Sequence, residues 1–375
     1  MSTQQSIELV PDNELIGYDD TQGLAHRIVQ LVALNIPFSD IFIYEDKPLM
    51  IKRPLGIFAV SDAEVTREEI ESLFDILEPN WRTIITERAF DRSRNLNAAR
   101  IRANCFTFNN RKHRGAVIRR FPSRPLPLAE LGLTIHAQQF ATLDRGLVLV
   151  IGDTGQGKST TLASLLDRIN SERSGHILTI EDPIETEIAS RKCLVTQREV
   201  GLTSDCASFY VGAMDALREK ADVVMIGEIR DEDTAREALA LAESGPLVFA
   251  SLHAKSPEQG LAKMSRLLGG SVMQSESLAQ ALRGVIYQAL VPDMGGKFYH
   301  LANETITTNA SVAQAISRQE FGKIRTLLDS AQVQGGCNTM NSVLIKLMME
   351  RKISPQHALA VSTDKEKIRA EIMRR

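Results

Sequence analysis

Residues 146–160 read GLVLVIGDTGQGKST, an apolar run followed directly by glycines, a lysine and two hydroxyl residues. The run GLVLV predicts a buried strand, and TTLASLLDRI at 160–169 has the composition of a helix. Glycines at 152, 155 and 157 permit a tight turn whose backbone N–H groups point at an anion, and Lys158 can extend to the outer phosphates. The spacing G-x-x-x-x-G-K-[ST] therefore predicts a P-loop that binds a nucleoside triphosphate.

Nine consecutive residues of this loop are predicted to contact the nucleotide. They are Gly152, Asp153, Thr154, Gly155, Gln156, Gly157, Lys158, Ser159 and Thr160. The Ser159 hydroxyl is also suited to a magnesium ion, because magnesium prefers oxygen ligands close to bound phosphates. ATP and Mg²⁺ are therefore the predicted ligands.

Three apolar runs follow the loop, and each ends on an acidic residue or a histidine that could bind a ligand or take part in catalysis. They are HILTIED at 176–182, DVVMIGE at 222–228 and LVFASLH at 247–253. Helical stretches separate these runs, a pattern that predicts an α/β fold around a parallel sheet. Ligands of such sheets bind outside the carboxyl ends of the strands, so Lys158, Glu181 with Asp182, Glu228 and His253 are expected at one edge.

Glu228 and His253 each have a functional and a structural interpretation. An uncompensated carboxylate at the end of a buried strand is costly, so Glu228 is predicted to polarise the water that attacks the γ-phosphate. The structural alternative is a salt bridge from Glu228 to Arg230 or another neighbour. His253 is a candidate sensor of the γ-phosphate, although a lone histidine is often structural.

The segment EDPIE at 181–185 places three acids around a proline just after a predicted strand. Acids are common in surface turns, which is the structural interpretation. The order of the strands favours a role in binding magnesium or water for Glu181, Asp182 and Glu185.

The chain has 375 residues, enough for two ordinary domains, and its 43% hydrophobic and 24% charged content is typical of soluble protein. Its first residues, MSTQQSIELV, do not form a signal peptide, and no apolar run approaches the ~20 residues that span a bilayer. Four cysteines form no C-x-x-C pair, so we expect free thiols without a zinc site. The predicted location is the cytoplasm.

The pattern of the chain changes near residue 122. Residues 1–121 predict a small α+β domain, of which 1–20 carry several acids and are expected to be loosely ordered. The segment PSRPLPLAEL contains three prolines in six residues and predicts an extended linker over 122–130. Residues 131–375 form the predicted nucleotide-binding domain, with further helical patterns at 257–268, 277–290 and after Ser362.

A basic run extends from Arg82 to Arg124, with twelve arginines or lysines against two acids. It can be a solvated face, a nucleic-acid groove, or a source of cations for a phosphate on another domain or subunit. Aromatic residues that could stack on bases are sparse, so there is no strong nucleic-acid signature. Arg102 and Arg119 lie on predicted strands and are candidate arginine fingers.

These motifs together resemble those of the type II and type IV secretion traffic ATPases. GDTGQGKST resembles the Walker A motif of the family, ILTIEDPIE its aspartate box, ADVVMIGEIRD its atypical Walker B motif and LVFASLHAKS its histidine box. The four occur in the family's order, and the similarity covers residues 36–305. The branch of type IVB secretion and plasmid conjugation, with DotB and plasmid TraJ, is most similar, since the tetracysteine element of type II enzymes and the C-terminal motif of PilT are missing.

The resemblance implies a PAS-like N-terminal domain and a RecA-like P-loop NTPase motor domain, assembled as a homo-hexamer with nucleotide between the two domains. The implied roles fall on residues that match the family's motifs. They are Glu228 and Glu185 as catalytic carboxylates, His253 as sensor, and Arg102 and Arg119 as completing arginines, with Arg114 and Arg120 as alternatives. The chain departs from the family at Asp153 and Gln156, where proline and serine are usual.

The resulting interpretation is an ATP-hydrolysing ring motor that powers type IV, in particular type IVB, secretion or conjugative transfer. The resemblance implies partners among the inner-membrane and cytoplasmic components of such a channel. Three alternatives stay open at this point. They are a pilus retraction or assembly ATPase, a RecA-like nucleic-acid translocase, and an assembly protein that binds ATP but scarcely hydrolyses it.

Overall fold

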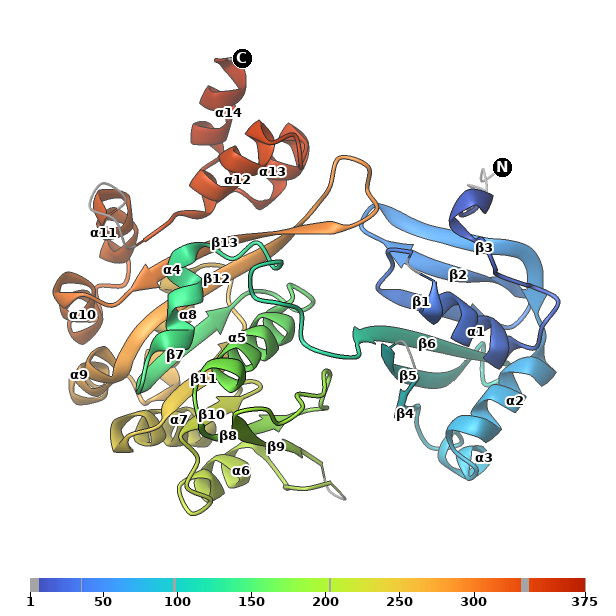
Figure 1. The fold of residues 1–375 in the computed structure, drawn as a ribbon, viewed down its shortest axis with the longest axis horizontal. Coiled ribbons are helices and arrows are strands. Elements are labelled where there is room, and N and C mark those ends of the chain that lie inside the picture. Colours follow the sequence, from blue (N-terminus) through green and yellow to red (C-terminus); the bar gives the residue numbers. More distant parts are fainter. Residues whose placement is uncertain (1–6, 35, 97–98, 202–203, 332–336, 375) are drawn as a thin grey trace. The chain divides into compact units, whose positions relative to one another are not determined.

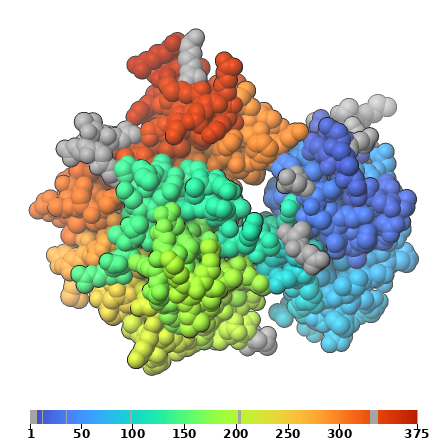
Figure 2. All heavy atoms as spheres, viewed as in Figure 1, coloured from blue at the N-terminus to red at the C-terminus, as the bar shows by residue number. Residues whose placement is uncertain are grey.

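The computed structural model describes residues 7–34, 36–96, 99–201, 204–331 and 337–374 (Figure 1). Contacts divide the chain into two compact units. The N-terminal unit comprises residues 1–123 with 295–299, and the C-terminal unit comprises 124–294 with 300–375. Figure 2 draws the described atoms of both units as spheres, with the N-terminal residues in blue. The sequence did not indicate that residues 295–299 group with the first unit.

The N-terminal unit is built on one antiparallel six-stranded sheet in the order β3-β2-β1-β6-β5-β4. Its strands are β1 (Asp40–Tyr44), β2 (Lys47–Arg53), β3 (Gly56–Val65), β4 (Phe90–Asn95), β5 (Ala99–Phe108) and β6 (His113–Pro122). The helical elements are η1 (Asp12–Glu14), α1 (Leu24–Ala33), α2 (Arg67–Leu77) and α3 (Trp81–Ile84). This arrangement is an α+β fold.

Local sequence accounts for the helices of this unit. In α1 the apolar residues Leu24, Ile28 and Leu31 recur at helical spacing and are buried in the core. A capping box precedes α2: Thr66 accepts a hydrogen bond from the Glu69 N–H, and Glu69 accepts one from the Thr66 N–H. Both orphan donors at the start of α2 are therefore satisfied.

Residues 7–20 of the segment expected to be loosely ordered make contacts with the rest of the N-terminal unit, and residues 1–6 lie outside the described residues. Val10 is buried, and its N–H donates to the carbonyl oxygen of Ala59 over 2.8 Å. Glu14 forms an ion pair of 2.6 Å with Arg53. The charge of Glu14 is therefore compensated by a basic residue far along the chain, a pairing that composition alone cannot reveal.

The C-terminal unit contains a seven-stranded sheet in the order β13-β12-β7-β11-β10-β8-β9. Its strands are β7 (Gly146–Ile151), β8 (Gly175–Glu181), β9 (Cys193–Glu199), β10 (Val223–Ile226), β11 (Leu247–Leu252), β12 (Leu282–Pro292) and β13 (Tyr299–Thr307). Every pairing from β12 to β9 is parallel. The four predicted apolar runs form the adjacent strands β7, β11, β10 and β8, so their carboxyl ends share one edge.

Both faces of this sheet are covered, as expected for a parallel sheet whose strands are continuously apolar. Alternate residues of β7 enter different cores: Val148 and Val150 pack with residues of α5, whereas Leu147 and Leu149 pack with those of α7. The helices before β12 are α4 (Ile135–Gln138), η2 (Gln139–Thr142), α5 (Lys158–Glu172), α6 (Phe209–Ala216), α7 (Glu232–Ser244), α8 (Pro257–Leu267) and α9 (Val272–Ala281). The strand that leads into the P-loop is therefore packed against helices on both faces of the sheet.

The predicted helix over 277–290 is wrong beyond residue 281, because α9 ends at Ala281 and β12 begins at Leu282. The strand pairs with β7 and is buried on both faces, so its apolar residues do not alternate with polar ones. Such a pattern does not distinguish a buried strand from a helix. Pairing with β7 in the folded sheet makes this segment a strand.

Helices follow β13: the first two pack in the core of the parallel sheet, and the later ones share a small separate apolar cluster with β12 and β13. The helices after β13 are α10 (Ala310–Ser317), α11 (Lys323–Ala331), α12 (Met340–Met349), α13 (Pro355–Val361) and α14 (Lys365–Met373). The last of these is the helix predicted after Ser362. Across the described residues, we find no helix that combines the length and apolar character needed to cross a membrane.

Candidate active site

The loop at 152–157 has the backbone that its glycines were expected to allow. Gly155 and Gly157 have φ values of 77°, in the left-handed region that residues with a Cβ rarely adopt. At Gly152 a Cβ would lie 2.7 Å from the carbonyl oxygen of Gln288, so a larger residue would separate the loop from β12. The helix α5 starts at Lys158, which places the N–H groups of its first turn beside the loop.

Gln156 fastens this loop to β12. The Gln156 side-chain oxygen accepts a hydrogen bond of 2.6 Å from the Leu290 N–H, and the Gln288 amide donates to the Gln156 carbonyl oxygen over 2.7 Å. A serine, usual at this position in the resembled family, is too short for the first bond. Asp153, the second residue at which the loop departs from the family pattern, is exposed to solvent.

Lys158, His253 and Glu228 form a continuous chain of contacts at the carboxyl edge. The Lys158 ammonium donates to the carbonyl oxygens of Gly152 and Asp153, at 3.0 Å each, and lies 3.3 Å from His253 Nδ1. His253 Nε2 lies 3.1 Å from a Glu228 oxygen. Because an ammonium can only donate, Nδ1 is the acceptor and Nε2 carries the proton that faces Glu228.

Burial shapes the charges of this chain. It lowers the pKa of the Lys158 ammonium, and the carboxylates of Glu228, Asp153 and Glu185 oppose that shift. Burial, and then the Lys158 charge, lower the pKa of His253 below its usual value, which favours the neutral imidazole near pH 7. The neutral ring is the form that can accept from Lys158 and donate to Glu228 at the same time.

Arg230 provides the salt bridge that was the structural alternative for Glu228. Its Nε lies 2.8 Å from the second Glu228 oxygen, and its Nη1 lies 3.6 Å from Asp182 at the end of β8. The Glu228 carboxylate therefore faces His253 on one side and Arg230 on the other. The salt bridge and a catalytic role are compatible, because Arg230 is more than half exposed and can move away.

The carboxylates after β8 differ from one another. Glu181 is buried and accepts hydrogen bonds from the Thr179 hydroxyl and the Gln197 amide, and burial raises its pKa to about 7. Asp182 is partly exposed beside Arg230. The hydroxyl of Ser159 in the first turn of α5 and the oxygens of Asp182 are the hard donors that magnesium prefers, so these residues fit that ion. The magnesium assignments, including that of Glu181, stay predictions.

The candidate arginines lie on one sheet of the N-terminal unit. Arg102 on β5 and Arg119 on β6 are direct partners across the strands, and both are partly exposed. Arg102 pairs with Asp91 at 3.1 Å, and Arg119 pairs with Asp40 at 2.9 Å. The alternatives are less available: Arg120 is buried enough for desolvation to lower its pKa, and Arg114 packs against Trp81.

Much of the basic run is neutralised by acids that lie outside it in the sequence. Arg82 pairs with Asp75, Arg92 with Glu78 and Arg114 with Glu71, all from α2 or the residue after it. The excess of positive charge between residues 82 and 124 is therefore smaller in the fold than along the chain. These pairings connect segments that no local pattern relates.

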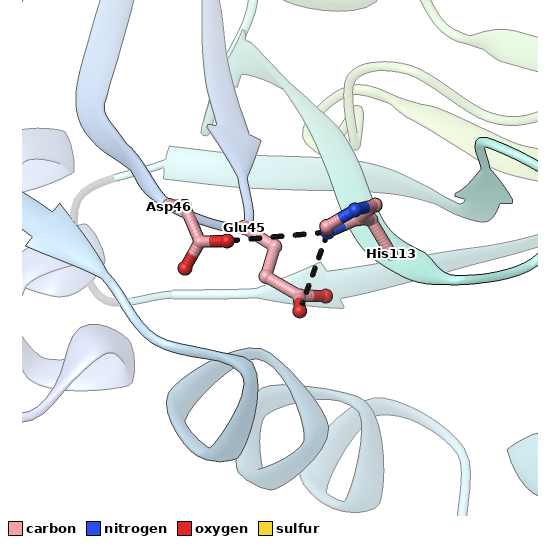
Figure 3. Close-up of side chains that lie close together, drawn as sticks. All are labelled: Glu45, Asp46 and His113. Carbon is pink, nitrogen blue, oxygen red and sulfur yellow. Dashed lines mark ion pairs between the residues drawn. The ribbon is translucent and has the colours of Figure 1, made fainter.

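One cluster of possible metal ligands was not predicted. Glu45, Asp46 and His113 lie together in the N-terminal unit, with His113 Nδ1 at 3.4 Å from Glu45 and 4.0 Å from Asp46 (Figure 3). Glu45 also accepts hydrogen bonds from Arg67 and from the Arg114 N–H. Because Arg67 already compensates its charge, the cluster is a structural ion-pair network.

These features define a P-loop nucleotide-binding protein with acidic and histidine groups gathered at the carboxyl edge of a parallel sheet. Comparison with known proteins places the chain in one family within this class. Residues 96–354 match the model of the family described as type II/IV secretion system protein. The chain belongs to this family, and it is an ATPase.

Individual relatives agree with that membership. The type IV pilus retraction ATPase PilT of Pseudomonas aeruginosa is 38% identical over 264 residues, which cover 69% of this chain and 74% of PilT. The type IV pilus ATPase PilU of the same organism is 37% identical over 257 residues, covering 68% of this chain and 66% of PilU.

Two solved structures share the architecture. The structure of the pilus retraction motor PilT with bound ADP has a TM-score of 0.78 at 31% identity and covers 93% of this chain and 99% of PilT. That of the Legionella pneumophila ATPase DotB has a TM-score of 0.78 at 21% identity and covers 95% and 98%. The predicted fold class, a RecA-like ATPase domain with a smaller N-terminal α+β domain, is confirmed.

We expect Gln156→Ala to weaken nucleotide binding by about five- to thirtyfold. The substitution removes one hydrogen bond and leaves the Leu290 N–H unpaired. This destabilises the ordered conformation of the loop by roughly 1–2 kcal/mol. Titration with a fluorescent ADP analogue measures the effect. Gln139→Ala, which removes an exposed glutamine in the same unit, is the matched control. Equal affinities of the two variants would contradict a role of Gln156 in ordering the loop.

Proposed function

We propose that this ATPase is a ring-shaped motor of six copies that powers a type IV, in particular a type IVB, secretion or conjugative transfer system. The observation that carries the motor proposal is the contact chain from Lys158 through His253 to Glu228. It connects the group that would hold the phosphates to the group that would activate water. A protein that only binds ATP has no need of this connection.

In the proposed reaction, Lys158 turns from the carbonyl oxygens of its own loop toward the β- and γ-phosphates of ATP. This movement breaks the contact between Lys158 and His253 Nδ1. His253 is then free to rotate toward the γ-phosphate and report its presence. The loop N–H groups and the first turn of α5 neutralise charge on the phosphates, because they are fixed donors that need no rearrangement.

Glu228 is the proposed residue that polarises the attacking water. Release of His253 and movement of Arg230 would free both of its oxygens for that water. Mg²⁺, held through Ser159 and Asp182, would neutralise charge on the phosphates when it is bound. Glu185, whose charge acts on Lys158, is proposed to support the site from the loop after β8.

Arginines complete the proposed site. Arg102 and Arg119 occupy neighbouring positions on the exposed side of β5 and β6, each held by one carboxylate. An arginine finger stabilises the charge of the transition state and can be worth ~10³–10⁵ in rate. We propose that these arginines approach the phosphates in the assembled ring, where partial exposure leaves them available.

A pilus retraction motor is the second candidate. The 37–38% identity with PilU and PilT favours it, whereas the DotB structure is only 21% identical to this chain. Our preference for secretion or conjugation rests on the missing C-terminal retraction motif of PilT. Partners in either case would be membrane-associated components of the machine.

We expect Lys158→Ala to abolish nucleotide binding or turnover, and Glu228→Gln to bind ATP without hydrolysing it. Both substitutions leave the strands intact, and the amide keeps the shape of Glu228 while losing the charge that polarises water. Phosphate release and binding of labelled ATP are measured in parallel. Asp231→Asn provides a comparable change at a helix cap outside the contact chain. Normal turnover by Glu228→Gln would reject the catalytic assignment.

We expect the chain to assemble as six copies in the presence of ATP, as native mass spectrometry can show. Mixing two inactive variants tests whether the arginines act between subunits. Rings that combine Lys158→Ala with Arg102→Gln or Arg119→Gln should recover part of the ATPase activity, because one interface joins an intact loop to an intact arginine. Absence of recovery, with mixed rings present, would place the arginine and the loop in the same subunit.

Genetic tests separate the two candidate machines. We expect deletion of the gene in its host to lower conjugative transfer or secretion without loss of twitching motility. Expression of the chain in Pseudomonas aeruginosa lacking PilT is the converse test. Restored twitching there, measured against a Lys158→Ala control, would favour the pilus retraction motor instead.

A further inference from the structure

The N-terminal unit contains a cavity that the proposed ATPase reaction does not use. Its volume is about 210 Å³, and it is lined by residues of α2, of α3 and the two positions after it, of β5, of the β5–β6 turn and of β6. Three of the lining residues are arginines: Arg82, Arg111 and Arg114. Glu71 is the one carboxylate among the residues that line it. The cavity therefore carries a surplus of positive charge.

The arginines of this cavity have donors to spare. Arg82 is paired with Asp75 over 2.6 Å, and Arg114 Nη1 donates to the Arg111 carbonyl oxygen over 3.1 Å. Their distances to Glu71 are longer: Arg114 Nε lies 3.4 Å from this carboxylate and makes no hydrogen bond, and Arg82 Nη2 lies 3.9 Å from it. Both separations exceed the 2.7–2.9 Å of a charge-assisted hydrogen bond. Within the described chain, the Arg111 guanidinium has no ion pair or hydrogen-bond partner. A guanidinium offers five N–H donors, so these groups can accept a further anion.

The turn that supplies Arg111 has an unusual backbone. Asn109, Asn110 and Arg111 are three consecutive residues with φ values of 50°, 54° and 67°. Asparagine tolerates this left-handed conformation, whereas arginine rarely adopts it. Strained residues of this kind concentrate at binding sites, where surrounding contacts hold them. Here the strained residue is one that lines the cavity.

The contacts that hold this turn involve Glu45, one of the residues drawn in Figure 3. Arg67 donates to the Lys112 carbonyl oxygen and pairs with Glu45, and Glu45 accepts from the Arg114 N–H over 2.9 Å. Both ends of the segment from 112 to 114 are thereby fixed. Arg111 and Arg114 are presented to the cavity by a network that has no other evident role in the site.

We propose that this cavity binds a small phosphate-bearing anion, of the size of a diphosphate. Guanidinium groups bind phosphate oxygens in pairs, and the Thr107 hydroxyl at the wall can donate as well. The cavity is smaller than the ~300–1,000 Å³ of pockets for drug-sized ligands, which suits an anion of the size of a diphosphate.

Isothermal titration of the full chain with sodium pyrophosphate tests this site. The titration uses the Lys158→Ala background, so that the P-loop does not contribute. We expect one site per chain, weakened at least about tenfold by Arg111→Gln and also weakened by Thr107→Val. Arg88→Gln, which removes an equal charge from an exposed residue outside the cavity, should leave the affinity unchanged.

The result that overturns the proposal is absence of pyrophosphate binding at millimolar concentration, or binding that Arg111→Gln and Thr107→Val do not weaken. Equal weakening by Arg88→Gln would also overturn it, because a general charge effect would then explain the binding. Cosedimentation with phosphatidylglycerol vesicles distinguishes the source of the phosphate. Vesicle binding that requires Arg111 would assign the anion to a lipid headgroup, whereas pyrophosphate binding alone assigns a soluble ligand.

Discussion

The buried ammonium of Lys158 is the constraint around which the carboxyl edge of the parallel sheet is arranged. A cation with so little exposure needs acceptors on every side, and it finds them in two loop carbonyls and the neutral ring of His253. His253 in turn requires Glu228 as acceptor for its other nitrogen. Three strands of the sheet are thus connected through side chains that one phosphate group could rearrange.

Strand β12 gives the loop its rigidity. It lies beside β7 and reaches the loop through Gln288 and Leu290, both of which bond to Gln156. The loop is therefore bound to the sheet on one side and continues into α5 on the other. A loop that is ordered before phosphate arrives loses less conformational entropy on binding, which favours tight association.

The arginines of the N-terminal unit show how charge along a chain differs from charge in a fold. The basic run is balanced by acids of α2, leaving particular groups with spare donors instead of one continuous positive face. On β5 and β6 these groups suit the nucleotide phosphate of the proposed ring. Around α3 and the β5–β6 turn they surround a cavity, so one basic segment can serve two separate anions.

The P-loop, the four apolar runs and their order are local features, and the strand-loop-helix unit with its parallel neighbours was predictable from them. So was the arrival of Lys158, Glu228 and His253 at one edge, because parallel strands place their carboxyl ends together. The position of β12, the hydrogen bonds that attach Gln156 to it and the pairing of Arg114 with Glu71 were not predictable. Each depends on residues distant in sequence whose contact is decided by packing of the whole fold, and no local periodicity carries that information.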